Sequence, residues 1–211
     1  MQHCVYLIDS DTAIQEMLGR ILNGAGWQYE GYDSFSQFYR HHPQLNDLSG
    51  CLLFDVHYPG DNALLPLAAW RARGLTLPVV IISRHASIRL CRQAFRGGAF
   101  DFLLKPLDPA LVLEAVAGAL AYHRQGVEQR QKHRDLRHKL ARLTPREQQV
   151  LAQIMRGQAS KEIARTLILS PRTVEAHRAS IFDKLEVNSV AKLLTRYAAI
   201  YLRSPGVQDV I

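Results

Sequence analysis

The sequence predicts two domains, an α/β domain with a parallel sheet followed by an all-α domain, on three observations. In the first half of the chain, short apolar runs alternate with helical patterns. In the second half, helix-start signals follow one another with no strand-like run between them. The halves also differ in charge, since residues 1–121 carry a net charge of −2 and residues 122–211 carry +9. A length of 211 residues suits two small domains.

Five strand-like runs are expected in the first half, at residues 4–9, 27–32, 51–55, 77–83 and 100–104. Helical patterns separate these runs, at residues 11–25, 62–73 and 86–97 and after two capping signals. Ser34 and Gln37 form a capping box that opens one helix, and Asp108-Pro109 opens a long one. Strands alternating with helices predict a parallel sheet that is covered on both faces. In such a sheet, ligands bind outside the carboxyl ends of the strands.

The second half is divided into a polar segment and a helical domain. Residues 123–140 are polar almost all round, and we expect residues 122–140 to form a solvated helical linker with Gly126 as its weak point. Four short helices are expected in residues 141–211. Thr144 and Glu147 form a capping box at the start of the first, Ser170 begins the third, and Asn188 caps the last. The predicted domains are therefore 1–121 and 141–211, joined by the linker.

The composition excludes several classes of protein. With 47% hydrophobic and 21% charged residues, the chain is globular rather than disordered. Its apolar runs are far shorter than the roughly 20 residues that cross a bilayer, and its first residues form no signal peptide. Three cysteines are too few for a disulfide framework. We therefore expect a cytoplasmic protein.

Polar side chains follow four of the expected strands. Asp9 and Asp55 end two of these strands, Ser83 ends another, and Lys105 follows the last. Carboxylates that converge at strand ends make an oxygen-rich site suited to Mg²⁺. An ionised aspartate near a divalent ion can attack a phosphoryl group, and a hydroxyl and an ammonium group can hold the phosphoryl oxygens. The first domain is thus expected to contain a site for phosphoryl transfer at the ends of these strands.

With these residues in place, residues 3–121 resemble the receiver domain of two-component response regulators. The resemblance implies a flavodoxin-like (βα)₅ fold with strand order 2-1-3-4-5. It implies that Asp55 is the phosphoacceptor and that Mg²⁺ is bound by Asp9, Asp55 and the backbone carbonyl of His57. It further implies that Lys105 holds the phosphoryl group. Ser83 and Phe102 match the hydroxyl and aromatic positions that couple phosphorylation to the output surface.

The sequence departs from the family pattern at two positions. Ser10 replaces the second acid, which should weaken Mg²⁺ binding, and Arg84 replaces a small residue after the hydroxyl. Two interpretations follow. In the first, a partner histidine kinase phosphorylates Asp55. In the second, the receiver is degenerate and regulates transcription without Mg²⁺ or phosphate, with Arg84 paired to the carboxylates as a built-in cation. An Arg84 that simply points into solvent is the alternative to that pairing.

An enzyme is the competing class of protein for the first domain. Asp9, Ser83 and Lys105 also resemble the first three motifs of haloacid-dehalogenase-type phosphatases. That family needs a further strand with acidic metal ligands after the lysine, whereas this chain has only Asp108-Pro109, which opens a helix. We therefore predict that the protein is not an enzyme.

The basic domain contains a helix with an unusual outward face. Val174, Ile181 and Leu185 form one apolar stripe that faces the core. Small and polar side chains on the other faces let the helix approach base pairs and phosphates of DNA. The residues that we expect to contact DNA are Lys161, Arg172, Thr173, Glu175, Ala176, His177, Arg178, Ala179 and Lys184. Glu175 is the candidate for accepting from a cytosine amino group.

This segment resembles the LuxR-type helix-turn-helix over residues 141–203. The resemblance rests on 143–147, Gly157, 161–164, 173–178 and 184–185. It implies that residues 171–185 form the recognition helix in the major groove and that residues 189–202 form a dimerisation helix. The expected dimer contacts are Val190, Leu193, Leu194 and Tyr197.

A receiver joined to this module resembles the NarL/FixJ family, most closely its FixJ branch. Membership implies a transcription factor that binds an inverted repeat in double-stranded DNA as a homodimer, under the control of a histidine kinase. RNA polymerase is a further candidate partner. Two other functions remain open for the second domain: a helical bundle that binds protein, and an RNA-binding antiterminator. Comparing affinities for duplex DNA and stem-loop RNA separates the latter from a DNA-binding regulator.

Overall fold

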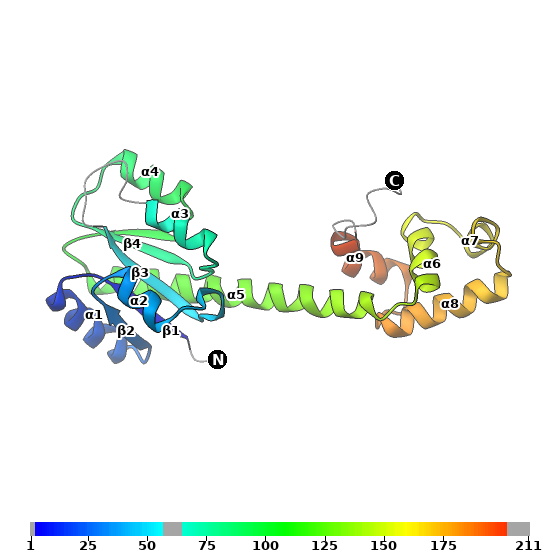
Figure 1. Cartoon of the computed structure of the whole chain (residues 1–211), viewed down its shortest axis with the longest axis horizontal. Coiled ribbons are helices and arrows are strands. Elements are labelled where there is room, and N and C mark those ends of the chain that lie inside the picture. Colours follow the sequence, from blue (N-terminus) through cyan, green and yellow to red (C-terminus); the bar gives the residue numbers. More distant parts are fainter. Residues whose placement is uncertain (1–2, 57–64, 202–211) are drawn as a thin grey trace. The chain divides into compact units, whose positions relative to one another are not determined.

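A computed structural model of the chain describes residues 3–56 and 65–201 (Figure 1). The chain divides into two compact units, Met1–Val127 and Glu128–Ile211. Within the described residues, no helix has both the length and the apolar character needed to cross a membrane.

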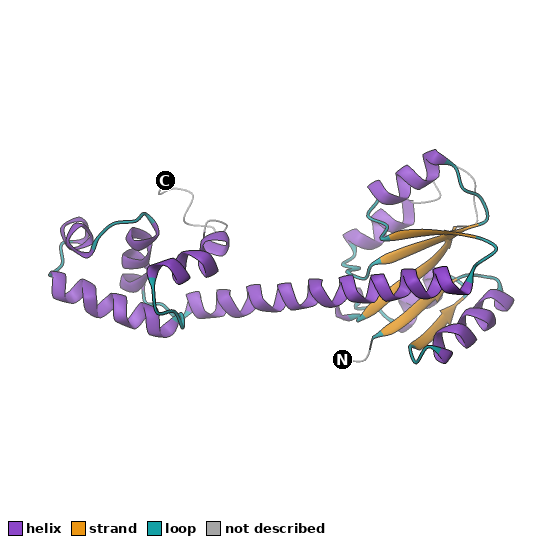
Figure 2. Cartoon of the chain, turned by 180° about the vertical axis from the view of Figure 1, so that it is seen from behind, coloured by secondary structure: helices purple, strands orange, loops and turns teal. Residues whose placement is uncertain are grey.

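The first unit is built on a five-stranded parallel sheet with the order β2-β1-β3-β4-β5, which confirms the predicted fold (Figures 1 and 2). The strands are β1 Cys4–Ile8, β2 Gln28–Tyr32, β3 Gly50–Val56, β4 Val79–Ser83 and β5 Asp101–Leu104. The helices are α1 Thr12–Gly24, α2 Phe35–His41, α3 Leu65–Ala72, α4 Ile88–Arg96 and α5 Pro109–Ala141, with a short 3₁₀ helix, η1, at Leu45–Asp47.

Each face of the sheet has its own core. On one face, Tyr6 of β1 belongs to a cluster with Phe38 of α2 and Trp70 of α3. On the other face, Leu7 belongs to a cluster with Leu18 of α1 and residues of α5. Every residue of β1 and β4 is buried, because helices cover both faces. The carboxyl ends of the strands are thereby left as the place where polar side chains gather.

The start of α2 follows its expected capping residue with one difference. Ser34 accepts a hydrogen bond from the backbone N–H of Gln37, as a capping box requires. The Gln37 side chain, however, accepts from the backbone N–H of Asp33 rather than from that of Ser34. In this capping box, the hydrogen bond to the Gln37 side chain therefore comes from Asp33, one residue before Ser34.

The last helix of the receiver and the polar segment after it form a single helix. Helix α5 runs from Pro109 to Ala141 and passes through Gly126 without a break, so the expected weak point does not interrupt it. Within the second unit, Leu136 and Leu140 of this helix pack against the core. The end of the predicted linker is thus part of the folded unit rather than solvated on all sides.

Up to residue 201, where the description of the second unit ends, four further helices follow: α6 Pro145–Met155, α7 Ser160–Leu167, α8 Pro171–Lys184 and α9 Val190–Tyr201. The capping box of Thr144 and Glu147 is present in full, which confirms the prediction for α6. The cap of α9 was predicted wrongly: Ser189, not Asn188, accepts from the backbone N–H of Lys192 at 3.2 Å. Val174, Ile181 and Leu185 are fully buried, as their spacing predicted.

Candidate functional site

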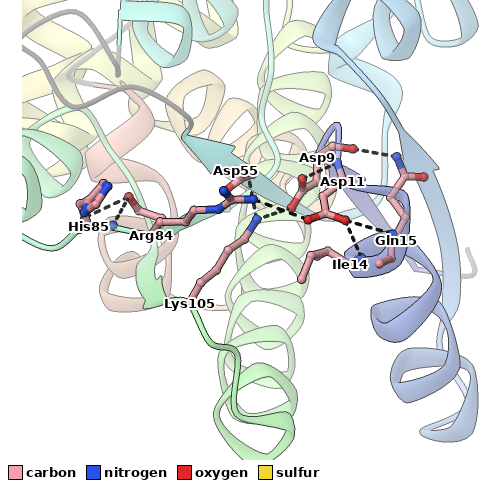
Figure 3. A network of polar contacts seen from close by, with 10 residues as sticks. Asp9, Asp11, Ile14, Gln15, Asp55, Arg84, His85 and Lys105 are labelled. Carbon is pink, nitrogen blue, oxygen red and sulfur yellow. Dashed lines mark hydrogen bonds and ion pairs between the residues drawn. The ribbon is translucent and has the colours of Figure 1, made fainter.

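Three charged side chains meet at the carboxyl ends of the strands in the first unit (Figure 3). The Lys105 ammonium lies 2.7 Å from Asp9 Oδ2 and 3.1 Å from Asp55 Oδ2. All three side chains are at least nine-tenths buried. Asp9 and Asp55 come from neighbouring strands, and Lys105 follows β5. The sequence placed these three residues at one edge of the sheet, and the structure brings them into direct contact.

Backbone hydrogen bonds hold Asp9 in position. Its Oδ1 accepts from the backbone N–H of Asp11 at 2.9 Å, while its backbone carbonyl accepts from Gln15 Nε2 at 2.7 Å. Gln15 also donates to Asp33, so it joins α1 to the end of β2. The role of Gln15 had no signal in the sequence, because a glutamine on an exposed helix turn is usually solvated.

The site carries an excess of negative charge. Asp9 and Asp55 supply two carboxylates, and Lys105 supplies one ammonium group. Two carboxylates are hard oxygen ligands that fit a divalent cation such as Mg²⁺. The third predicted ligand, the carbonyl of His57, lies outside the described residues. Ser10 contributes no carboxylate, and no group of three or more His, Cys, Asp or Glu suited to a metal ion occurs among the described residues. Asp9 and Asp55 are thus the two described carboxylates that would hold such an ion.

Arg84 pairs with a different carboxylate from the two predicted. Its guanidinium lies 3.6 Å from Asp11 Oδ2, and Lys105 takes the place beside Asp9 and Asp55 (Figure 3). The other oxygen of Asp11 caps α1 by accepting from the backbone N–H of Ala13. Asp11 is therefore engaged and does not replace the acid missing at position 10. The Arg84 side chain is 64% exposed, so this ion pair is weak.

Ser83 and Phe102 flank the acidic site. Ser83 is buried at the end of β4, and its hydroxyl donates to the backbone carbonyl of His85 at 2.9 Å. It also accepts from the His85 backbone N–H, which closes the start of the loop toward α4. Phe102 is half-buried and packs against the sheet-face cluster that contains Tyr6. In this structure the Ser83 hydroxyl thus bonds within its own loop.

Helix α8 of the second unit presents most of the predicted DNA-contacting residues. Its N-terminus is capped by Ser170, which accepts from the backbone N–H of Thr173 at 3.0 Å. Arg178 lies half-buried, with Nε 3.9 Å from Glu175 and the guanidinium over the Phe182 ring. The exposed members of the predicted set are Lys161, Arg172, Glu175, Ala176 and Ala179, and the half-buried members are Thr173, His177 and Arg178.

Lys184 must be reassigned. Its ammonium lies 2.8 and 2.7 Å from the two carboxylate oxygens of Glu147, and Glu147 Oε1 also accepts from the Ser180 hydroxyl at 2.6 Å. Burial by itself raises the pKa of Glu147, but hydrogen bonds from Lys184, Ser180 and Thr144 outweigh it and lower the pKa to about 2. Lys184 therefore joins α8 to Glu147 of α6 through an ion pair and is not a free donor to phosphates.

Three of the four residues predicted as dimer contacts pack within their own domain. Leu193 and Tyr197 are fully buried, and the Tyr197 hydroxyl donates to the backbone carbonyl of Leu185. Val190 packs against the same core. Leu194 remains, with 37% of its surface exposed. Helical spacing identified the apolar face of α9 correctly but could not tell whether this face contacts the domain or a second copy.

Comparison with known proteins places both units in described families. Residues 5–117 match the family described as "Response regulator receiver domain", and residues 141–197 match "Bacterial regulatory proteins, luxR family". The transcriptional regulatory protein TdiR of Thauera aromatica is 34% identical over 193 residues, which make up 90% of this chain and 83% of that protein. The transcriptional regulatory protein FixJ of Azorhizobium caulinodans is 34% identical over 190 residues, covering 90% of this chain and 89% of that protein.

A solved structure matches nearly the whole chain. The response regulator StyR matches with a TM-score of 0.79 at 31% identity, covering 94% of this chain and 100% of that one. The relatives thus match the receiver and the helix-turn-helix within a single alignment. The chain belongs to the FixJ-like response regulators and is a transcriptional regulator, not an enzyme, with a receiver domain and a LuxR-type DNA-binding domain.

Proposed function

We propose that a partner histidine kinase phosphorylates Asp55 and that this modification controls dimerisation and DNA binding. The observation that carries the proposal is the buried contact of Lys105 with both Asp9 and Asp55. In the transfer, an Asp55 carboxylate oxygen attacks the phosphorus of phosphohistidine, and the P–N bond breaks to leave the histidine of the kinase. Lys105 is placed to neutralise the new phosphoryl oxygens. Bound Mg²⁺ would supply further positive charge to those oxygens.

The position of Ser83 supports a route from the phosphoryl group to the surface. Its hydroxyl now donates to the His85 carbonyl, within the loop that leads to α4. A phosphoryl group on Asp55 offers stronger, charged acceptors at the end of the neighbouring strand. Transfer of the Ser83 hydrogen bond to such an oxygen would free this loop, and Phe102 would repack on the same sheet face.

For the output domain, we propose that α8 reads an inverted repeat in double-stranded DNA. Glu175, Ala176 and Ala179 face the bases, whereas phosphate contacts come from Lys161, Arg172, Thr173, His177 and Arg178. A homodimer would pair through the exposed side of α9, which includes Leu194. RNA polymerase would be a further partner, and the cytoplasm the compartment. We assign residues 1–121 to the receiver, 122–140 to the linker and 141–211 to the output domain.

The first test is the intact mass of the full chain after incubation with acetyl phosphate and Mg²⁺. We expect one added phosphoryl group on the wild type and none on Asp55→Asn. An adduct that persists in Asp55→Asn would place the modification elsewhere. Absence of an adduct on both proteins would contradict phosphorylation by this donor.

The DNA-binding role is tested separately from phosphorylation. Removing one phosphate contact with Arg178→Ala should flatten the log–log salt dependence of binding to duplex DNA by about one unit for all sequences. Glu175→Ala should instead relax preference at one base position in a selection experiment. Arg40→Ala, an exposed change in the receiver, is the control and should alter neither property.

A second candidate function is regulation without phosphate, and the pairing of Arg84 with Asp11 favours it. This pair joins the start of the loop toward α4 to the cap of α1, beside a site that lacks a second acid at position 10. If Arg84 holds the receiver in one state, Arg84→Ala should change DNA affinity of unphosphorylated protein, and acetyl phosphate should change nothing in the wild type. Equal affinity of Arg84→Ala and wild type would remove this candidate.

A further inference from the structure

The C-terminal end of helix α5 packs against the output domain. Leu136 and Leu140 pack against its core, and the Lys139 ammonium pairs with Glu186, just beyond the C-terminal end of α8. Figures 1 and 2 both show the last turns of α5 meeting this end of α8. The last turns of α5 are thus attached to the output domain next to the C-terminal end of the recognition helix.

The part of α5 that follows Val127 carries a stripe of positive charge. Arg130, Arg134 and Arg137 recur at intervals of four and three residues and therefore lie on one face of the helix. All three are exposed. The stripe lies about a third of a turn around the helix from Leu136 and Leu140, so packing against the core leaves it uncovered.

The charge of the stripe is not neutralised within the domain. Among the described residues, none of the three arginines forms an ion pair. The nearby acid Asp135 accepts a hydrogen bond from Gln131 instead. A stripe with three like charges would repel the same stripe on a second copy, so it does not suit a coiled-coil seam between two linkers.

The length of α8 brings the stripe toward DNA. Fourteen residues make this helix about 21 Å long, whereas the major groove is about 12 Å wide. A recognition helix that reads bases with its first turns therefore extends past the groove at its C-terminal end. The end of α5 is attached beyond this point and therefore starts outside the groove, on the side of the neighbouring sugar-phosphate backbone.

We propose that Arg130, Arg134 and Arg137 bind backbone phosphates of duplex DNA next to the site occupied by α8. The inference rests on the proposed DNA-binding role of α8 and adds a second, sequence-independent contact to it. Arginine suits this role because its planar guanidinium forms paired hydrogen bonds with phosphate oxygens. The linker thus increases affinity for DNA without reading its sequence.

The test compares the full chain with two triple variants of equal net charge. One carries Arg130→Gln, Arg134→Gln and Arg137→Gln. The matched control removes three exposed arginines of the receiver, by Arg40→Gln, Arg92→Gln and Arg96→Gln. Binding to a random-sequence duplex of about four helical turns (roughly 40 bp) is followed by fluorescence anisotropy over a series of salt concentrations. The log–log slope should fall by about 2 to 3 units in the linker variant and stay unchanged in the control.

A third variant separates charge from helix structure. Lysine at all three linker positions keeps the charge and a high helix propensity, so its slope should equal that of the wild type. A linker variant with the wild-type slope, while Arg178→Ala loses about one unit, would overturn the linker contact and leave the function of α8 intact. An equal loss in the receiver control, or a loss in the lysine variant, would also overturn it. No binding by the wild type, either untreated or after incubation with acetyl phosphate and Mg²⁺, would overturn both proposals.

Discussion

Each unit of the protein places a lysine against a buried carboxylate, but the charges are balanced in only one of them. In the output domain, Lys184 meets one carboxylate, that of Glu147, whose oxygens also accept from Ser180 and the Thr144 backbone. In the receiver, Lys105 meets two carboxylates, Asp9 and Asp55. The first cluster is electrically complete, whereas the second holds one negative charge in excess.

The difference indicates what each cluster does. Removing either partner of a charge-balanced pair destabilises the fold, because the remaining charge then has no partner of opposite sign. A cluster with excess negative charge gains from a further cation, and its charge state can change with a bound ion or a covalent phosphoryl group. The balanced cluster thus holds α6 to α8, and the unbalanced cluster is the site that can change state.

The strongest test of this comparison removes the balanced cluster. Glu147→Ala leaves Lys184 without its carboxylate and deletes half of the capping box of α6, so we expect the output domain to lose about 3 kcal/mol of stability. Both tryptophans, Trp27 and Trp70, lie in the first unit, so tryptophan fluorescence reports on that unit and the loss of helical circular dichroism reports on both. In urea, only the circular dichroism transition should shift. Gln149→Ala, an exposed change on the same helix, should leave both transitions unchanged.

The pH dependence of stability follows from the same cluster. The pKa of Glu147 falls from its ordinary value of 4.5 to about 2 on folding. Because the folded pKa is the lower one, the stabilisation is complete above pH 4.5 and is lost as the pH falls toward 2. The urea midpoint of the output domain should therefore decrease over this window. Glu147→Gln should lack this part of the decrease, and an identical pH profile in both proteins would refute the role of the carboxylate.

A smaller effect is expected where charge is added to the unbalanced cluster. Ser10→Asp places a third carboxylate next to Asp9, so Mg²⁺ should bind about tenfold more tightly, as measured by calorimetry. Ser10→Asn alters the side chain without adding charge and should leave the affinity unchanged. If both variants bind Mg²⁺ as the wild type does, the acid pair is not the cation site.

The smallest effect concerns the turn between α7 and α8, away from either cluster. Ile168 adopts a left-handed conformation with φ of 56°, and its side chain is 92% exposed. A β-branched residue is strained in this region, whereas asparagine tolerates it. Ile168→Asn should stabilise the output domain by about 1 kcal/mol in urea unfolding, because no burial is lost. Ile168→Val keeps the strain, and its midpoint should match that of the wild type.

Much of the fold could be predicted because its signals are local. The short apolar runs of β1 and β4 and the capping box at Thr144 each depend on residues a few positions apart. The gathering of Asp9, Asp55 and Lys105 at one site could be predicted, because the carboxyl ends of parallel strands lie at one edge of a sheet. The same local rule failed at α9, where Asn188 and Ser189 are both good caps and only the helix start distinguishes them.

The sequence by itself determined the two domains, the parallel sheet and the residues that gather at its edge. Tertiary structure alone decided which partner each charged or apolar side chain finds. Lys184 meets Glu147, 37 positions away, and Arg84 meets Asp11 rather than the acid pair. Tyr197 turns into its own domain instead of toward a second copy. Spacing along the chain places a residue on one face of its element, but the packing of elements determines what lies opposite that face.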